Sequence, residues 1–123
     1  MMERDERQLL IIGAWLFARH GQSRRARILL EALAEADPRD GVVAAVLAWL
    51  LLGEGLAESG LATLRAAEMP SHLARAGAML ETRALRALGR EEDAAARWRR
   101  YLNAAKGAKR EWIAQTEFKE DRG

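Results

Sequence analysis

Three glycines divide the chain at a fixed interval. Gly21, Gly55 and Gly89 are evenly spaced along the sequence, and other residue types recur in step with them. Small residues follow each glycine by five positions and bulky apolar residues by nine, while apolar or small residues precede it by four and by seven. These columns are Ala26, Gly60 and Ala94; Leu30, Leu64 and Trp98; Phe17, Leu51 and Leu85; and Ala14, Ala48 and Thr82. Such a period predicts a supersecondary unit stacked on copies of itself.

The composition predicts that each unit is built from helices. Ala and Leu far outnumber Val, Ile and Thr, and unbranched side chains lose little rotamer freedom in a helix. Apolar residues recur at helical spacing within each segment. Ser23 and Ser71 are candidate start signals for two of the helices. We predict helices over residues 4–19, 23–36, 41–53, 57–67, 72–88 and 91–105, with a shorter seventh segment over 109–119.

A 34-residue period of helix pairs resembles the tetratricopeptide (TPR) repeat, in which two antiparallel helices pack against each other and against the next pair. Small residues then lie where the two helices cross closely, and the glycine serves the tight turn between them. The expectation is an all-α fold: three tandem TPR-like helix-turn-helix repeats in a right-handed superhelix with a C-terminal capping helix. Residues 1–123 form a single domain, with repeats at about 7–40, 41–74 and 75–108 and an extension over 109–123.

The extension carries Trp112, Ile113 and Phe118 among charged residues. The last repeat of a stack exposes an apolar flank that a capping helix usually covers, so capping is the expected role of these residues. Binding of a partner or dimerisation is the alternative. Trp98 and Tyr101 occupy packing columns of the third repeat and are expected in the core.

The first helices of the three repeats are expected to line a concave inner face. Trp15, Trp49 and Arg83 follow one another at the repeat interval and form one line across that face. Tryptophan and arginine are frequent anchors of protein interfaces, although a tryptophan in a small helical protein is also commonly a core residue. The predicted partner-binding residues are Ile11, Trp15, Ala45, Trp49, Leu52, Met79, Arg83 and Arg86.

The charge balance does not favour nucleic acid as the partner. Twenty Lys and Arg residues against eighteen Asp and Glu residues leave a formal net charge of +2. One local run is basic without an intervening acid, and it is either a solvated helix face or a dock for an acidic partner. No aromatic stacking platform interleaves with it, so nucleic-acid binding is not expected. The run comprises Arg97, Arg99, Arg100, Lys106, Lys109 and Arg110.

Catalytic and metal-binding patterns are absent from the sequence. There is no cysteine, and His20 and His72 do not form a metal-ligand motif. Neither a P-loop nor a GxGxxG or GxSxG motif occurs. We therefore expect no enzyme activity, no cofactor and no metal. The longest apolar run, Val42 to Leu52, is far shorter than the roughly 20 residues of a membrane span, and the N-terminus lacks a signal-peptide pattern, so a cytoplasmic location is expected.

Two stretches resemble the YscY-type chaperones of bacterial type III secretion systems, which are TPR proteins of similar size. The first covers residues 8–40, from the run Leu9-Leu10-Ile11-Ile12-Gly13-Ala14-Trp15-Leu16 to Asp37-Pro38. The second covers residues 83–102, from Arg83-Ala84-Leu85-Arg86-Ala87-Leu88-Gly89 to Tyr101-Leu102. The middle repeat and the tail do not share this resemblance, and the chain is richer in Ala and Arg.

The resemblance implies a non-catalytic export chaperone. Such proteins bind a small exported partner of the YscX type, and the pair engages the cytosolic domain of the inner-membrane export gate. The chain would then be at most peripheral to that membrane, and self-association without its client is possible. The alternatives are a chaperone for another type III client, such as a needle subunit or translocator, and a general TPR scaffold for protein–protein interaction.

Overall fold

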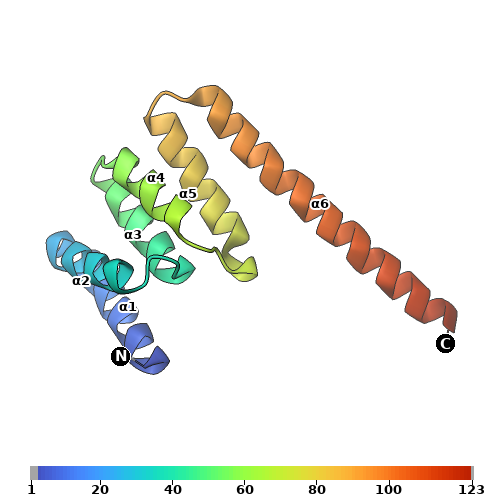
Figure 1. The fold of residues 1–123 in the computed structure, drawn as a ribbon, viewed down its shortest axis with the longest axis horizontal. Coiled ribbons are helices and arrows are strands. Elements are labelled where there is room, and N and C mark those ends of the chain that lie inside the picture. Colours follow the sequence, from blue (N-terminus) through green and yellow to red (C-terminus); the bar gives the residue numbers. More distant parts are fainter. Residues whose placement is uncertain (1–2, 123) are drawn as a thin grey trace.

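The computed structural model describes residues 3–122, with side chains described as far as Glu117. This part of the chain is all-helical and contains no β-strand (Figure 1). Its helices are α1 (Arg4–Arg19), α2 (Ser23–Ala36), α3 (Gly41–Gly53), α4 (Ala57–Ala66), the short 3-10 helix η1 (Ser71–Leu73), α5 (Ala74–Ala87) and α6 (Glu91–Arg122). The first three have the predicted bounds, and α4 ends one residue before its predicted end. None of the described helices combines the length and apolar character of a membrane span.

The three evenly spaced glycines occupy equivalent turns. Gly21, Gly55 and Gly89 have φ angles of 76°, 81° and 75°, in the left-handed region that glycine adopts without steric cost. In each turn the N–H of the following residue donates to the carbonyl four residues before the glycine, at 2.8 Å. The donors are Gln22, Leu56 and Arg90, and the acceptors are Phe17, Leu51 and Leu85. This bond pattern closes a helix at a left-handed residue, so the predicted role of the glycines is confirmed.

The predicted small-residue columns lie inside the protein. Ala14, Ala26, Ala48 and Ala94 are fully buried, and Gly60 is buried as well. A Cβ atom at Gly60 would lie 3.5 Å from the side chain of Leu52 and 3.6 Å from a carbonyl of α3, so α4 crosses α3 closely at this point. The columns therefore mark the helix–helix crossings, as the sequence indicates.

The bulky columns are buried only where a further helix pair covers them. Leu51 and Leu85 are 4% and 1% exposed, whereas Phe17 in the first pair is 37% exposed. At the other end, Leu30 and Leu64 are buried, but Trp98 is only partly buried. The prediction of Trp98 and Tyr101 as core residues is therefore only partly correct. No further pair follows α6 in the described chain, so their outer sides stay open.

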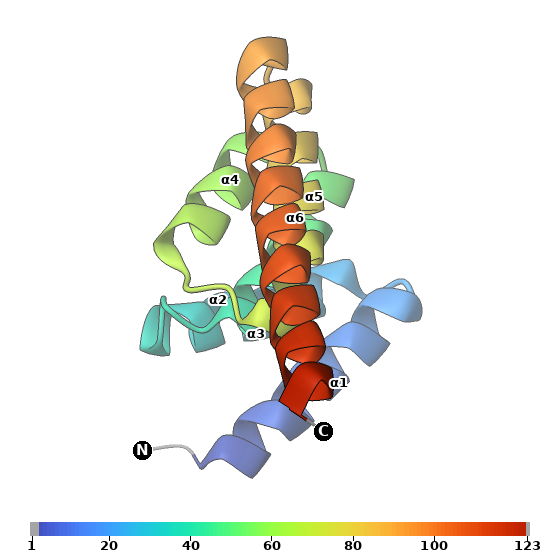
Figure 2. The ribbon, with the colours of Figure 1, turned by 90° about the vertical axis from the view of Figure 1, so that its right-hand side faces the viewer.

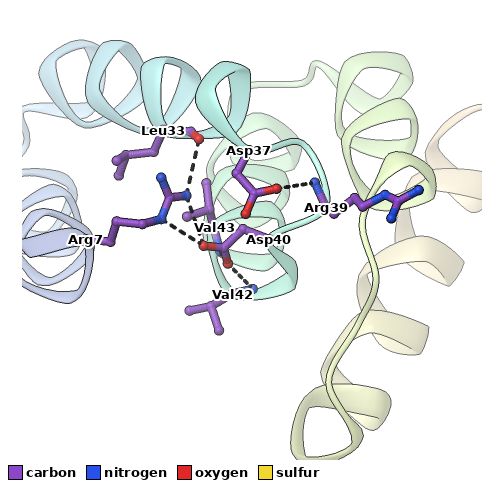
Figure 3. Close-up of polar contacts among 7 residues, drawn as sticks. All are labelled: Arg7, Leu33, Asp37, Arg39, Asp40, Val42 and Val43. Atoms are coloured by element: carbon purple, nitrogen blue, oxygen red, sulfur yellow. Dashed lines mark hydrogen bonds and ion pairs between the residues drawn. The ribbon is translucent and has the colours of Figure 1, made fainter. Parts of the chain in front are cut away.

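Asp40 joins the first pair to the second (Figure 3). Its Oδ1 accepts hydrogen bonds from the N–H groups of Val42 and Val43, at 3.0 and 3.1 Å, and so caps α3. Its Oδ2 accepts from the guanidinium of Arg7 in α1 at 3.0 Å, and the same guanidinium donates to the carbonyl of Leu33 at 3.3 Å. The predicted start signals Ser23 and Ser71 make no such cap: Ser23 is the first residue of α2, and Ser71 lies in η1.

The predicted capping helix does not form. Residues 91–105 and 109–119 belong to one helix, α6, which extends well beyond the end of α5 in both views (Figures 1 and 2). Trp112 and Ile113 are 66% and 38% exposed and cover no flank of the body, while the side chain of Phe118 lies outside the described part. Alanine, lysine and arginine on both sides of Gly107 favour a helix, and one glycine costs only about 1 kcal/mol relative to alanine.

The turn at Gly89 is open to a direct test. Replacing Gly89 with valine places a β-branched residue in the left-handed region, which costs about 1–2 kcal/mol, and we expect the free energy of unfolding to fall by that amount. Chemical denaturation followed by circular dichroism measures it. Gly13→Val is the matched control, because Gly13 lies within α1 and a Cβ there meets nothing within 4 Å. Equal stability of the two variants would contradict the assignment.

Candidate partner-binding groove

The eight residues predicted to contact a partner divide into two groups. Ala45 is buried, and the partly buried Ile11 and Leu52 pack against the two apolar clusters of the core. These three side chains are engaged within the body. The exposed group comprises Trp15, Trp49, Met79, Arg83 and Arg86. The surface available to a partner therefore comes from α1, α3 and α5.

Trp49 and Arg83 line a common hollow of about 240 Å³. Ala18 of α1 and Leu50 of α3 contribute to its wall, so the hollow lies where the three first helices of the pairs come together. Two members of the line predicted from the repeat interval thus face the same space.

Trp15, the third member of that line, lies outside this lining. Its ring contacts the guanidinium of Arg19, which lies 4.8 Å from the ring centroid, on the same helix. This cation–π contact occupies one face of the ring within the protein itself, so that face does not need a partner protein. Of the three residues in the predicted line, only Trp49 and Arg83 line this hollow.

A second hollow, of about 280 Å³, lies between α5 and α6. Arg83 lines this hollow as well as the first, so the two hollows adjoin at this side chain of α5. Met79 and Arg86, both predicted, also line it. Arg75, Thr82 and Trp98 complete its lining and were missed as binding residues. Arg75, Met79 and Arg83 are spaced by four residues, and this helical spacing is the signal in the sequence that identifies Arg75.

We call the combined surface the arginine groove and define it by Trp49, Arg75, Met79, Arg83, Arg86 and Trp98. Its charge is positive and little compensated. Arg86 is 3.7 Å from Glu91, with both side chains well exposed, so this ion pair is weak. Glu54, at the edge of the first hollow, is already paired with Arg27 at 2.8 Å. Within the described part of the chain, Arg75 and Arg83 make no ion pair.

Thr82 adds an unusual polar group to the second hollow. The residue is 8% exposed, and its Oγ1 is buried with no hydrogen-bond partner among the described residues. The equivalent positions in the other two pairs are alanines. A buried hydroxyl without a partner costs about 1–3 kcal/mol, so Thr82 is less favourable at this position than the alanines of the other two pairs.

The basic run on α6 has two parts. Arg97 is bound within the body, because its Nε lies 2.7 Å from the carboxylate of Glu81 on α5, and Arg65 of α4 approaches the same carboxylate at 3.5 Å. This cluster ties α4, α5 and α6 together. The remaining basic residues are exposed on α6: Arg99, Arg100, Lys106, Lys109 and Arg110.

The histidines lie apart from the groove. His20 follows the last residue of α1, and His72 lies in η1. Among the described residues, no three His, Asp or Glu side chains gather in a way that would bind a metal ion.

The groove thus presents cationic and apolar side chains side by side. The sequence matches no known family model and no curated protein, so the functional interpretation rests on this geometry and on the pattern of the chain.

Proposed function

We propose that this protein is a non-catalytic, TPR-like binding module whose arginine groove holds an acidic amphipathic helix of a partner protein. The observation that carries the proposal is the double role of Arg83, which lines both hollows and so joins Trp49 on α3 to Met79 and Trp98. The equivalent, evenly spaced glycine turns support the TPR-like arrangement.

The two kinds of side chain in the groove have separate tasks. Trp49 is 44% and Met79 50% exposed, so each has apolar surface left for a ligand to bury. An amphipathic helix presents apolar residues at intervals of three or four, which suits such a groove. Arg75, Arg83 and Arg86 are spaced along α5 and would pair with carboxylates on the edge of that helix, fixing its direction and register.

The more specific proposal is a cytoplasmic chaperone of the YscY type. In this reading, the groove binds and stabilises a small exported partner of the YscX type and helps to deliver it to the export gate. The support for it is the resemblance of residues 8–40 and 83–102 described above. A general protein–protein interaction scaffold, or a chaperone for a needle subunit or translocator, would use the same groove for a different client.

The test is co-expression of the tagged chain with the small open reading frames beside its gene, followed by mass determination of any complex. A stable complex with one short protein of the secreted type supports the chaperone. A chain that purifies alone in every combination contradicts that reading. Binding of the partner's acidic helix as a synthetic peptide then tests the groove itself.

Trp49→Ala is expected to weaken binding of that partner at least tenfold, because truncating a tryptophan anchor removes about 1.4 kcal/mol or more. Arg83→Ala is expected to have a similar effect, because both hollows lose a wall. Isothermal titration calorimetry measures the affinities, and circular dichroism verifies that helicity is kept.

Two further variants delimit the groove. Trp15→Ala is expected to change affinity less than Trp49→Ala, although the two tryptophans are 41% and 44% exposed. Arg39→Ala, in the connection between α2 and α3, is the control for charge; its only ion pair in the described chain is at 3.7 Å, with both side chains 78% exposed. If Trp49→Ala and Arg83→Ala bind like Arg39→Ala, the groove is not the binding site.

A further inference from the structure

Helix α1 carries an outward apolar stripe with no partner in the described chain. Its inner face is marked by Ala14, which is fully buried. When the helix is projected at 100° per residue, five residues lie within about 40° of the opposite direction. Three of them are large and apolar: Leu9, Ile12 and Leu16 are 70%, 55% and 46% exposed. The other two are charged and exposed. We call Asp5, Leu9, Ile12, Leu16 and Arg19 the α1 stripe.

The later helix pairs show what kind of contact this face makes. One repeat interval after Leu9 and Leu16 come Val43 and Leu50 of α3, which are buried in the core cluster that α3 shares with α1 and α2. One interval further, Ala84 of α5 is buried in the second cluster with a leucine of α4. In both cases the preceding pair covers the face. No helix precedes α1 in the described chain, so the same face stays exposed there and is suited to packing against another helix.

Charges at the two ends of the stripe indicate which helix that is. The five residues follow one another at alternating intervals of four and three, as in a coiled-coil seam. Asp5 lies at the first end and Arg19 at the last, and neither makes an ion pair in the described chain. The stripe is therefore complementary to itself when a second copy is turned end for end. Arg4 and Glu6 lie about 100° from the centre of the stripe, on opposite sides, and so outside the contact.

We propose that two copies of this chain associate through antiparallel pairing of their α1 stripes about a two-fold axis. Ile12 then lies beside its own copy at the axis, and Leu9 of one copy lies opposite Leu16 of the second. At each end, Asp5 of one copy lies beside Arg19 of the other. A parallel pair would instead oppose aspartate to aspartate and arginine to arginine.

The body leaves room for this pairing in both copies. α2 and α3 pack on the side of α1 that contains Ala14, and all five residues of the α1 stripe are exposed. The long helix α6 lies on the far side of the molecule from α1 (Figure 1). No residue of the α1 stripe lines the arginine groove, so dimerisation and partner binding are tested independently.

The first experiment is sedimentation of the full chain over a concentration range up to roughly 1 mM, a range that detects even weak pairing. We expect a reversible dimer. Ile12→Arg is expected to raise the dissociation constant at least tenfold, because two arginines then meet at the axis without an acidic partner. Ile28→Arg is the matched control, since Ile28 of α2 is 57% exposed and Ile12 is 55% exposed. A monomer throughout, or a dimer that Ile12→Arg weakens no more than Ile28→Arg does, overturns the proposal.

The direction of pairing is tested by reversing the charges. Asp5→Arg and Arg19→Asp are each expected to raise the dissociation constant roughly threefold or more, because each creates two like-charged contacts per dimer. The double variant exchanges the two ends and is expected to restore the dimer. Circular dichroism verifies that helicity is kept, since Asp5 also lies in the first turn of α1. Single variants that dimerise like the wild type, or a double variant no stronger than the singles, would contradict the antiparallel register.

Discussion

Replacing Gly41 with alanine is expected to be among the most damaging substitutions in the protein. Gly41 is the first residue of α3 and is buried. A Cβ atom there would overlap the carbonyl oxygen of Glu68 and come within 2.6 Å of Cδ of Pro70 and 3.1 Å of Cα of Met69. These atoms belong to the main chain or to a proline ring, so they do not move aside as the end of a flexible side chain would.

A hydrogen bond to another connection also holds the segment that contains Glu68, Met69 and Pro70 in place. The N–H of Glu68 donates to the carbonyl of Arg39 at 3.0 Å, which ties this connection to the one before α3. We expect Gly41→Ala to lower the free energy of unfolding by about 2–3 kcal/mol, the upper part of the usual overpacking penalty of about 1–3 kcal/mol. Chemical denaturation gives the value. Gly53→Ala, at the other end of α3, is the matched control because a Cβ there meets nothing within 4 Å. A similar loss in both variants would rule out this contact as the cause.

Asp40→Ala is expected to cost about 2 kcal/mol, from two separate losses. Two N–H groups at the start of α3 lose their acceptor, which typically costs about 1 kcal/mol. Arg7 then keeps only the carbonyl of Leu33, although its side chain is 16% exposed, and leaving a largely buried charge without its partner is unfavourable.

Two further variants separate these losses. Asp40→Asn keeps a cap acceptor but loses the ion pair, so its stability is expected to lie between those of the wild type and Asp40→Ala. Asp37→Ala is the control, since Asp37 is exposed and its only described side-chain hydrogen bond is the one from the N–H of Arg39 at 3.2 Å. If Asp37→Ala is as destabilising as Asp40→Ala, the contacts of Asp40 with Arg7, Val42 and Val43 in Figure 3 are not what joins the first two pairs.

The helix pairs could be predicted because their signals are local. A glycine at each step of the repeat ends one helix in the left-handed region, and alanine at the crossings permits close packing. The end of α6 could not be predicted. A helix that stopped near Gly107 would leave a separate segment carrying Trp112 to pack on the body, but Trp112 is exposed and the helix continues instead. The capping role of Asp40 was missed, because it depends on the backbone angles of the residue just before the helix. The residue type alone does not give these angles.

The candidate site was predicted only in part for a different reason. Position along a repeat tells which helix face a residue occupies, but not how one pair is rotated against the next. Trp15 and Trp49 are therefore equivalent in sequence, yet only Trp49 lines the first hollow, while Arg75 of α5 and Trp98 of α6 line the second hollow together. The sequence also predicts a separate capping helix after the third pair, whereas α6 continues as one helix, and Trp98 stays open to the second hollow.

Helix contacts that lie mainly between neighbouring pairs have a consequence for how the protein opens. α1 and α2 pack on α3, whereas α4, α5 and α6 form the other end, and the core is divided into two clusters accordingly. Units held only by their neighbours can detach from an end without disrupting the rest. Amide hydrogens of α1 and α2 then exchange with solvent through an opening in which α3 to α6 keep their structure. The arginine groove on α5 survives such an event, losing only the walls that Ala18 of α1 and Ser23 of α2 give to the first hollow.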